Sequence, residues 1–177
     1  MAKEKWLVDA AHSSIDFAVK HMMIATVKGA FHEFDATVEA DLADLTTANI
    51  AFSVNVASVD TRNSDRDNHL RSADFFDVEN YPQMTFQSTS IKKTGDGDYE
   101  VTGDLTIRGT THPATFEAAF EGQGKDPWGN EKVGFSANGR INRSDYGLTW
   151  NAALETGGVL VGDQVKISLD IEAAKQA

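Results

Sequence analysis

Hydrophobic residues recur at every second position along most of this chain, and a period of two indicates β-strands rather than helices. In the segment Ile15–His21 the odd positions carry Ile, Phe, Val and His, whereas Asp16 and Lys20 lie on the opposite face. Alternation of this kind predicts antiparallel strands with one apolar and one polar face. Eight such stretches follow one another: Ile15–His21, Val27–Ala40, Ile50–Val56, Met84–Ser88, Tyr99–Ile107, Phe116–Phe120, Val133–Ile141 and Val165–Ile171.

Eight antiparallel strands can close on themselves, and closure removes the exposed edges of the sheet. We therefore predict an all-β, eight-stranded antiparallel barrel, with a two-sheet sandwich as the alternative. Strands of about 11 residues favour the barrel, because they give it a height of roughly 27 Å after a ~40° tilt. In the second stretch the apolar parity switches between Phe31 and Phe34. We interpret this switch as a bulge residue that bends one continuous strand.

One segment between the third and fourth stretches lacks the alternation. We predict a short surface helix over Ser64–Arg71, with Ser64 as its N-cap, Asp67 at the capping-box spacing and Leu70 as its apolar anchor. Turns, or a helical stub in the last case, are predicted at Thr94–Gly97, Gly122–Gly129, Gly157–Gly158 and Asp145–Trp150. No linker, repeat or low-complexity tract divides the chain, so residues 1–177 are expected to form a single domain.

The formal net charge of −11 disfavours nonspecific binding to nucleic acid or to anionic lipid surfaces. The absence of cysteine excludes a disulfide framework, a thiolate metal site and a cysteine nucleophile. Met1–Lys5 is polar and is not followed by a signal segment, and no apolar run reaches the ~20 residues that a membrane span needs. As written, the chain is expected to be cytoplasmic and to have no membrane span.

The sequence offers little for metal binding or catalysis. No pair among the five histidines has a zinc-type spacing, so no metal is expected. The segment Asn63–Asp74 loosely resembles a calcium loop, but it lacks the glycine at position six and the glutamate at position twelve, so a capped helix is favoured. The chain also lacks the Gly-x-Ser-x-Gly motif of a nucleophilic serine and the glycine motifs that bind phosphate.

The inward-facing positions carry several small residues, which leave space that larger side chains would fill. They are Gly29, Gly103, Ala118, Ala137 and Gly139. As a set they predict a cavity, although each glycine alone is also explained by backbone geometry at a barrel bend. His21 and Arg143 continue the inward parity of their strands. They form either a structural ion pair or hydrogen bond at one end of the barrel, with Asp67 as one candidate partner of the arginine, or a cavity mouth that holds an anionic or carbonyl head group.

Short motifs occur in a fixed order along the chain: Phe17, Val19 and His21; Gly29 and Phe31; Arg66, Asp67, His69 and Leu70 followed by Phe75, Phe76 and Asp77; Tyr81, Pro82 and Phe86; Gly103 to Gly109; and Asn142, Arg143, Tyr146 and Gly147. Each motif is weak alone, but their order and separations are specific. From Trp6 to Ala173 the chain resembles the YceI-like family of polyisoprenoid-binding, lipocalin-like proteins.

The resemblance implies an extended lipocalin-type barrel that holds an isoprenoid chain, a quinone tail or a fatty amide. It does not imply catalysis, so we expect a binding protein rather than an enzyme, and no cofactor. It also implies a homodimer. Several family members are exported, whereas this chain shows no signal segment, so carriage or storage inside the cell is expected. The alternatives are an enzyme for an apolar substrate with His21 as general base, and a ligand-free structural or interaction barrel. The residues expected to contact the ligand are Phe17, Val19, His21, Phe31, Phe52, Val54, Phe86, Val101, Leu105, Phe116, Phe135, Ile141 and Arg143.

Overall fold

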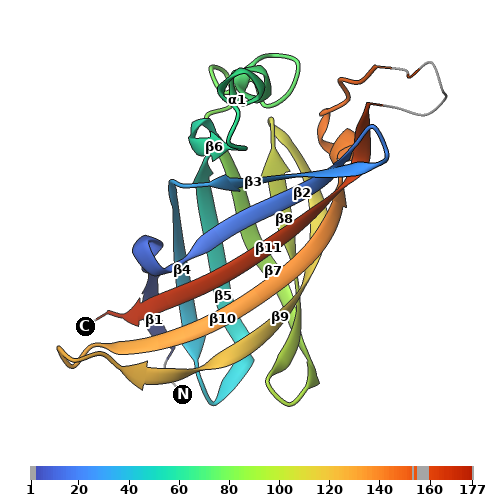
Figure 1. The fold of residues 1–177 in the computed structure, drawn as a ribbon. Helices are drawn as coiled ribbons and strands as arrows, with labels where there is room; N and C mark the ends of the chain where they lie inside the picture. The colour runs from blue at the N-terminus through green and yellow to red at the C-terminus, as the bar shows by residue number, and fades with distance from the viewer. Residues whose placement is uncertain (1–2, 153, 155–159, 177) are drawn as a thin grey trace.

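The computed structural model describes residues 3–152, 154 and 160–176, which form a closed antiparallel barrel (Figure 1). The strands are β1 (Glu4–Val8), β2 (Ser14–His21), β3 (Ala25–Phe31), β4 (Phe34–Asp41), β5 (Asp44–Asn55), β6 (Val59–Asp60), β7 (Gln83–Gly95), β8 (Asp98–Ile107), β9 (Thr110–Lys125), β10 (Glu131–Asn142) and β11 (Val161–Lys175). The helical segments are α1 (Ser64–Arg71) and the 3-10 turns η1 (Ala10–His12), η2 (Val56–Ser58) and η3 (Arg143–Tyr146).

Two of the barrel strands are interrupted. β2 pairs with β3 and β1 pairs with β4, so β1 and β2 together make one long strand and β3 and β4 make its neighbour. β11 pairs with β2 along one half and with β1 along the other, and β1 closes the ring between β11 and β4. With these two composite strands and β5, β7, β8, β9, β10 and β11, the barrel has eight strands. The prediction of an all-β, eight-stranded antiparallel barrel with one short helix between the third and fourth long strands is confirmed.

The parity switch in the second long strand has a different cause from the predicted one. His32 and Glu33 separate β3 from β4, and their two backbone N–H groups donate to Ser58 Oγ at 3.1 and 3.0 Å. The hydroxyl thus satisfies backbone donors that the strand ladder leaves free at the corner. The interpretation as a bulge inside one continuous strand is wrong: a break of two residues turns the strand and changes which parity faces inward.

Helix α1 has the predicted bounds, but its N-cap is one residue earlier than predicted. Asn63 has extended dihedral angles and accepts a hydrogen bond from the backbone N–H of Arg66 at 3.0 Å, so Ser64 is not the cap. Asp67 does not complete a capping box. Its buried carboxylate accepts bonds from Thr61 N and Thr61 Oγ1 at 2.9 and 2.5 Å. Because the carboxylate of Asp67 accepts these bonds from Thr61 and the residue lies within a helix, the calcium-loop alternative is disfavoured.

The predicted turns fall largely where expected. Gly97 adopts φ +76 in the β7–β8 turn. The 3-10 turn η3 begins two residues before the predicted stub, ends at Tyr146 and is capped by Gly147 with φ +76. At the predicted turn Gly122–Gly129 the strand continues further than expected: β9 reaches Lys125, and the turn begins at Asp126, whose carboxylate accepts hydrogen bonds from the backbone N–H groups of Trp128 and Asn130. The turn predicted at Gly157–Gly158 lies outside the described residues.

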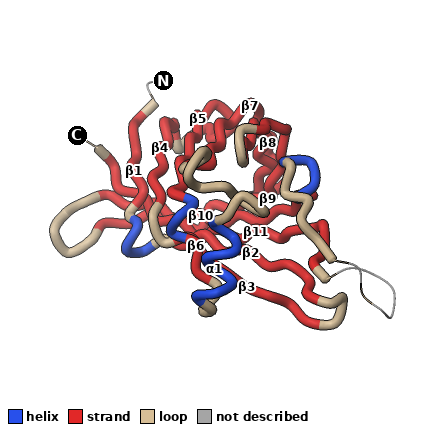
Figure 2. Tube along the Cα trace, turned by 90° about the horizontal axis from the view of Figure 1, so that it is seen from above, coloured by secondary structure: helices blue, strands red, loops and turns tan. Residues whose placement is uncertain are grey.

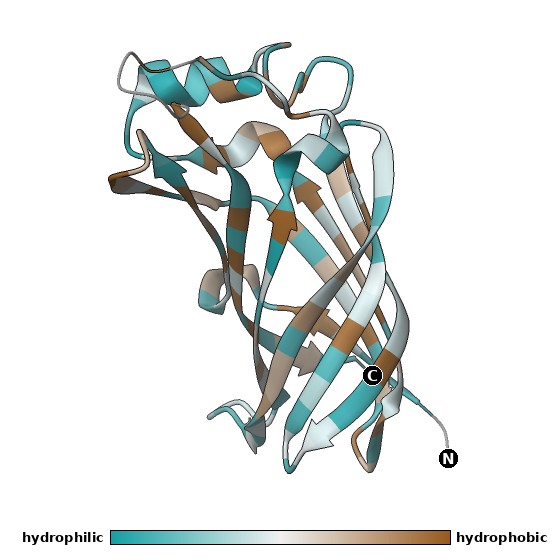
Figure 3. Cartoon of the chain, turned by 90° about the vertical axis from the view of Figure 1, so that its right-hand side faces the viewer, coloured by the Kyte–Doolittle hydropathy of each residue, from teal (hydrophilic) through white to brown (hydrophobic). Residues whose placement is uncertain are grey.

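The two ends of the barrel differ. Both chain termini lie at one end, and α1 lies at the other (Figure 1). A buried cluster that includes Trp6, Val38, Leu45 and Val133 fills the end near the termini. Hydrophobic and hydrophilic residues alternate along the strands (Figure 3), so the apolar faces converge on the interior. Among the described residues, no helix is both long and apolar enough to cross a bilayer.

Candidate ligand-binding site

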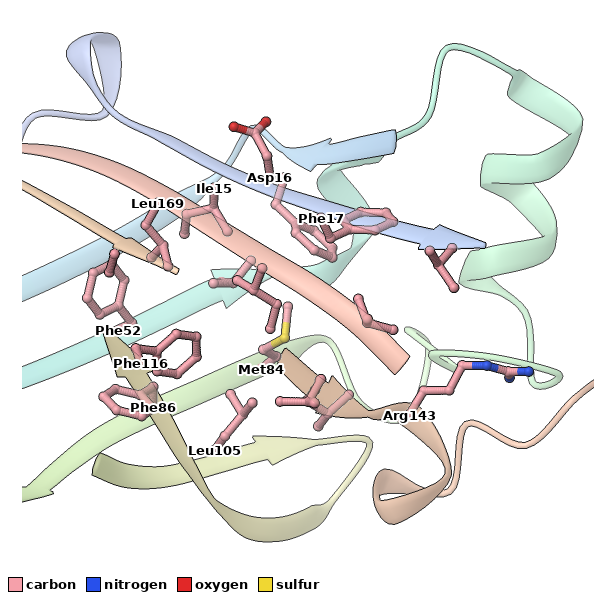
Figure 4. A pocket seen from close by; sticks show the side chains of 18 of the residues that line it. Ile15, Asp16, Phe17, Phe52, Met84, Phe86, Leu105, Phe116, Arg143 and Leu169 are labelled. Carbon is pink, nitrogen blue, oxygen red and sulfur yellow. The ribbon is translucent and has the colours of Figure 1, made fainter. Parts of the chain in front are cut away.

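The barrel interior contains a cavity of about 380 Å³, which is within the range of small-molecule binding sites. Every one of the eight barrel strands contributes side chains to its wall, and the wall is overwhelmingly apolar. Figure 4 shows Phe52, Phe86 and Phe116 grouped on one side of this space, with Arg143 well apart from them, whereas Asp16 points away from it. The cavity is therefore an apolar chamber with a polar group near one end.

All thirteen residues expected from the sequence to contact a ligand line this cavity: Phe17, Val19, His21, Phe31, Phe52, Val54, Phe86, Val101, Leu105, Phe116, Phe135, Ile141 and Arg143. The alternating parity brings them together because a closed barrel turns every apolar face toward one axis. Other lining residues lie outside the regular strands and were not predicted, among them His69, Phe75, Phe76, Leu148 and Trp150. His69, Phe75 and Phe76 belong to one of the motifs that carry the family resemblance, but no alternation of apolar residues marks these positions as inward-facing.

The inward glycines do not leave empty space, contrary to the prediction. A Cβ placed on Gly29 would lie 2.7 Å from Cε1 of Phe17, and one on Gly139 would lie 2.7 Å from Cδ1 of Phe116. Phe17 and Phe116 are the cross-strand partners of these two glycines. Neither glycine has a positive φ, so a bend that only glycine can adopt is not the reason for it either. Each glycine instead gives a phenyl ring room to lie against the wall, which keeps that ring out of the middle of the barrel.

The phenylalanines form a connected lining. The rings of Phe86 and Phe116 meet edge to face with their centroids 5.5 Å apart, and those of Phe17 and Phe31 are also 5.5 Å apart. Such pairs contribute beyond the burial of their area and hold each other's orientation. The interior surface is therefore a defined wall of rings rather than a loosely packed core.

His21 lies at the last position of β2, next to the cavity, and its backbone is paired with Val161 and Ala25. Its side chain is partly buried. Within the described part of the chain, its imidazole makes no side-chain hydrogen bond and no ion pair. A general base needs a second group that takes part in the proton transfer. The described residues provide none within hydrogen-bond distance of this ring.

Arg143 is buried, with 5% of its surface exposed, and it lines the same cavity. Its guanidinium donates to the carbonyl oxygens of Leu148, Gly162 and Val161 at 2.6, 2.8 and 3.3 Å. Burial lowers the pKa of this group, and the nearby Asp163 opposes that shift. No carboxylate of the described residues lies within ion-pair distance. The predicted pairing with Asp67 is wrong, because Asp67 is committed to Thr61 and backbone carbonyls hold the arginine instead.

Aromatic side chains surround the arginine. The guanidinium carbon lies 5.9 Å from the ring centroid of Phe75, and Phe75 packs against Trp150 and His69 with centroid separations of 5.4 and 5.0 Å. His69 is held in place by a 2.9 Å contact between its Nε2 and Asp74. A cation beside aromatic faces is stabilised by the ring quadrupole. This group of residues forms the polar end of an otherwise apolar chamber.

A second group of potential ligand atoms lies outside the cavity. Asp9, His12 and Glu172 bring three such atoms together, which no sequence spacing had indicated. His12 Nδ1 is 2.7 Å from Asp9 Oδ2, and Lys132 Nζ is 3.4 Å from that oxygen and 3.8 Å from a Glu172 oxygen. The lysine thus supplies a positive charge among these carboxylates. The arrangement is an ion-pair network that ties η1 to β10 and β11.

The sequence and the fold of this chain are both similar to those of known proteins. A family model described as YceI-like domain matches residues 6–173. A UPF0312 protein of Staphylococcus epidermidis is 44% identical over 169 residues, which cover 95% of this chain and 96% of the relative. The crystal structure of Burkholderia cenocepacia BcnA matches with a TM-score of 0.82 and 29% identity, over 93% of this chain and 98% of that one. A polyisoprenoid binding domain from Saccharophagus degradans, implicated in plant cell wall breakdown, shares the fold with a TM-score of 0.72 and 12% identity, over 97% and 98% of the two chains.

Proposed function

This chain belongs to the YceI-like domain family, and from that premise we propose that it binds a long apolar lipid inside its barrel. The observation that carries the proposal is the apolar cavity of about 380 Å³, to which all eight barrel strands contribute. A barrel interior packed solid by its own side chains would leave no such space. A polyisoprenoid, a quinone tail or a fatty amide fits this chemistry, and the related fold from Saccharophagus degradans is described as polyisoprenoid binding.

Burial of the apolar chain supplies the binding free energy in this proposal. Each methylene transferred from water into an apolar wall contributes about 0.8 kcal/mol. Part of this gain is offset by the lost motion of the ligand. The phenyl rings that lie against Gly29 and Gly139 already hold the wall in place, so little rearrangement of the protein opposes binding.

We further propose that Arg143 and His21 hold the head group of the ligand. Three of the five N–H donors of the guanidinium are used on carbonyl oxygens, which leaves two for a ligand. A buried positive charge without a carboxylate partner among the described residues favours an anionic or carbonyl oxygen. The ligand then lies with its polar end beside Arg143 and its apolar tail along Phe52, Phe86 and Phe116.

We propose carriage or storage of the lipid rather than catalysis, and two observations support this choice. Among the described residues, His21 lacks a titratable hydrogen-bond partner, and the wall of the cavity is overwhelmingly apolar. The sequence-based expectations of a cytoplasmic location and of a homodimer belong to the same proposal. Cell fractionation tests the location, and sedimentation equilibrium tests the homodimer.

Native mass spectrometry of the purified protein, before and after extraction with organic solvent, tests the binding of a lipid. We expect a stoichiometric excess mass that disappears on extraction, and an extract whose main component has a long apolar chain. The extracted protein should regain the mass when a polyisoprenoid alcohol or acid is added. Protein that carries no excess mass and does not take up such a chain would contradict lipid binding and favour the ligand-free structural barrel.

A further inference from the structure

The hairpin that joins β2 to β3 carries exposed hydrophobic residues at its tip. Met22, Met23 and Ile24 are 42%, 63% and 82% exposed, and they are consecutive in the chain. The hairpin projects sideways from the barrel at the end where α1 lies (Figures 1 and 2). Its base lines the cavity through Val19 and Val27. A continuous apolar tip on a projecting element, next to the polar end of the chamber, needs a physical reason.

The backbone of the tip adopts a conformation that is unfavourable for residues with a side chain. Met22 and Met23 have φ values of +53 and +64, and the backbone N–H of Ile24 donates to the carbonyl of His21 at 3.2 Å. Two consecutive positive φ values are those of a type I′ turn, in which asparagine and glycine are preferred. Residues with a side chain such as methionine are strained in this region. The stability of the turn therefore does not explain why methionines occupy it.

A basic band lies on the outer face of the same strands. Lys28, Ala18, Lys166 and Arg140 are cross-strand neighbours on β3, β2, β11 and β10, and Lys20 lies on the same face of β2. The four cations Lys20, Lys28, Arg140 and Lys166 are exposed, and none of them makes an ion pair with a described residue. The nearby Asp163 accepts hydrogen bonds from Ser144 N and Oγ at 3.0 Å each. The outer face beside the tip is thus locally positive in a chain of net charge −11.

From these two features we infer that the β2–β3 hairpin docks the protein on an anionic lipid surface, with Met22, Met23 and Ile24 inserted among the lipids and the basic band facing their phosphates. Exposed apolar residues flanked by lysine and arginine are the composition of interfacial membrane anchors. The charge complementarity selects an anionic surface over a neutral one. Docking here brings the polar end of the cavity next to the bilayer.

The overall negative charge does not prevent such docking. At physiological ionic strength the Debye length is about 8 Å, so charges on the far side of the barrel are largely screened from a surface that touches the hairpin. The sequence-based expectation that an anionic surface repels the chain considers only the total charge. Beside the hairpin, the four cations make the local charge positive.

Flotation with lipid vesicles tests docking directly. We expect the protein to float with vesicles of phosphatidylcholine and phosphatidylglycerol, and to bind vesicles of phosphatidylcholine alone more weakly. The double variant Met22→Asn, Met23→Gly replaces the tip with a preferred type I′ turn, so it should fold at least as stably as the parent but lose flotation. An equally exposed tryptophan at the β9–β10 turn provides the control: Trp128→Ser removes an 82% exposed side chain near the other end of the barrel and should leave flotation unchanged.

The charge contribution has its own matched pair of variants. Lys20→Gln, Lys28→Gln, Lys166→Gln removes three charges from the basic band and should weaken binding to the mixed vesicles about fivefold for each lysine removed. Lys92→Gln, Lys93→Gln, Lys125→Gln makes the same change in net charge at exposed positions on β7 and β9 and should have little effect. If both triple variants lost binding to the mixed vesicles equally, the basic band would not be the surface that faces the lipid phosphates.

The insertion of the tip can be observed at a single site. Because the chain has no cysteine, Ile24→Cys accepts an environment-sensitive fluorophore at that position alone. Its emission should shift to the blue on addition of the mixed vesicles, whereas the same label on Trp128→Cys should not respond. The inference is overturned if the parent does not float with the mixed vesicles, or if the asparagine–glycine variant floats equally well. These assays do not depend on a bound ligand, so their failure is distinct from a failure of the proposed lipid binding.

Discussion

The ring of Phe17 occupies the space that a side chain on its cross-strand partner Gly29 would need. A Cβ at position 29 would lie 2.7 Å from Cε1 of that ring and 2.9 Å from Cγ2 of Thr61. The glycine therefore determines where the ring lies, and the position of the ring determines how much of the barrel interior stays open. The same relationship holds between Gly139 and Phe116 on the other side of the cavity.

The substitution Gly29→Ala should therefore push the Phe17 ring toward the cavity. We expect it to lower the free energy of unfolding by roughly 1–3 kcal/mol, as overpacking of a well-packed core does. It should also weaken binding of an apolar ligand. Gly134→Ala is the control, because a Cβ there meets its nearest neighbour, Glu121, at an ordinary 3.6 Å. Denaturant titration of both variants measures the difference, and equal stability of the two would contradict the role assigned to Gly29.

The floor of the barrel depends on Trp6, which is 2% exposed and whose Nε1 has no hydrogen-bond partner among the described residues. Trp6→Ala should cost about 3–5 kcal/mol, because it leaves a cavity in the cluster with Val38 and Val133. Trp6→Phe should cost much less, because it retains an aromatic ring and removes the unpaired buried donor. Thermal unfolding of both variants checks this order. A phenylalanine variant as unstable as the alanine variant would show that the indole N–H has a partner.

The head-group role of Arg143 can be separated from its structural role. Arg143→Met leaves the carbonyl groups of Leu148 and Gly162 without their donor, so the protein should lose roughly 1–3 kcal/mol of stability whatever the ligand. The head-group proposal adds a second expectation. The variant should bind an apolar chain that ends in a carboxylate more weakly than the parent does, but a chain of the same length that ends in an alkane nearly as well. Equal loss for both ligands would leave Arg143 with a structural role alone.

The length of the ligand should affect its affinity in two stages. Each methylene that enters the cavity adds at most about 0.8 kcal/mol, so the dissociation constant should fall steadily along a series of lengthening isoprenoid acids. Once the space of about 380 Å³ is filled, further units lie outside and the affinity should level off. Titration with such a series locates the break. An affinity independent of length from the first member onward would contradict binding of the tail inside the barrel.

The network at η1 predicts a pH dependence. The hydrogen bond to Asp9 raises the pKa of His12 above its usual 6.5, and the same bond lowers the pKa of Asp9 below its usual 3.8. The stability contributed by His12 is therefore fully present below pH 6.5 and is lost as the pH rises through its raised pKa. The contribution of Asp9 is present above pH 3.8 and is lost as the pH falls through its lowered pKa. A histidine NMR titration should show that Asp9→Asn moves the pKa of His12 downward, and no movement would contradict this pairing.

The period of two was sufficient to predict the barrel and the residues that face its interior, because in a closed sheet the parity of a side chain decides its side. It did not predict contacts that depend on segments outside the strands. Phe75 and Trp150 reach the cavity from non-strand segments, and no periodicity marks such residues. The partners of Arg143 are backbone carbonyls, which the identity of residues does not reveal.

The glycines show a second limit of the sequence. A small residue on an inward face predicts spare volume, but whether a neighbouring side chain fills that volume depends on the cross-strand register. Register places Phe17 opposite Gly29 and Phe116 opposite Gly139, so the rings take the volume next to the glycines. The cavity exists nonetheless, because rings held against the wall leave the axis of the barrel free.

The central claim is that the ligand lies inside the barrel. It is tested most directly by comparing two single tryptophan substitutions, one on the inner face of β10 and one on its outer face. Ala137 lines the cavity, and its cross-strand neighbours Ala118 and Leu169 line it too, whereas the adjacent Asn138 is exposed. Titration of a polyisoprenoid acid into Ala137→Trp should show binding reduced at least about tenfold, because the indole fills the path of the chain, while Asn138→Trp should bind like the parent. If both variants bind like the parent while remaining folded, the ligand does not lie inside the barrel and the account is contradicted.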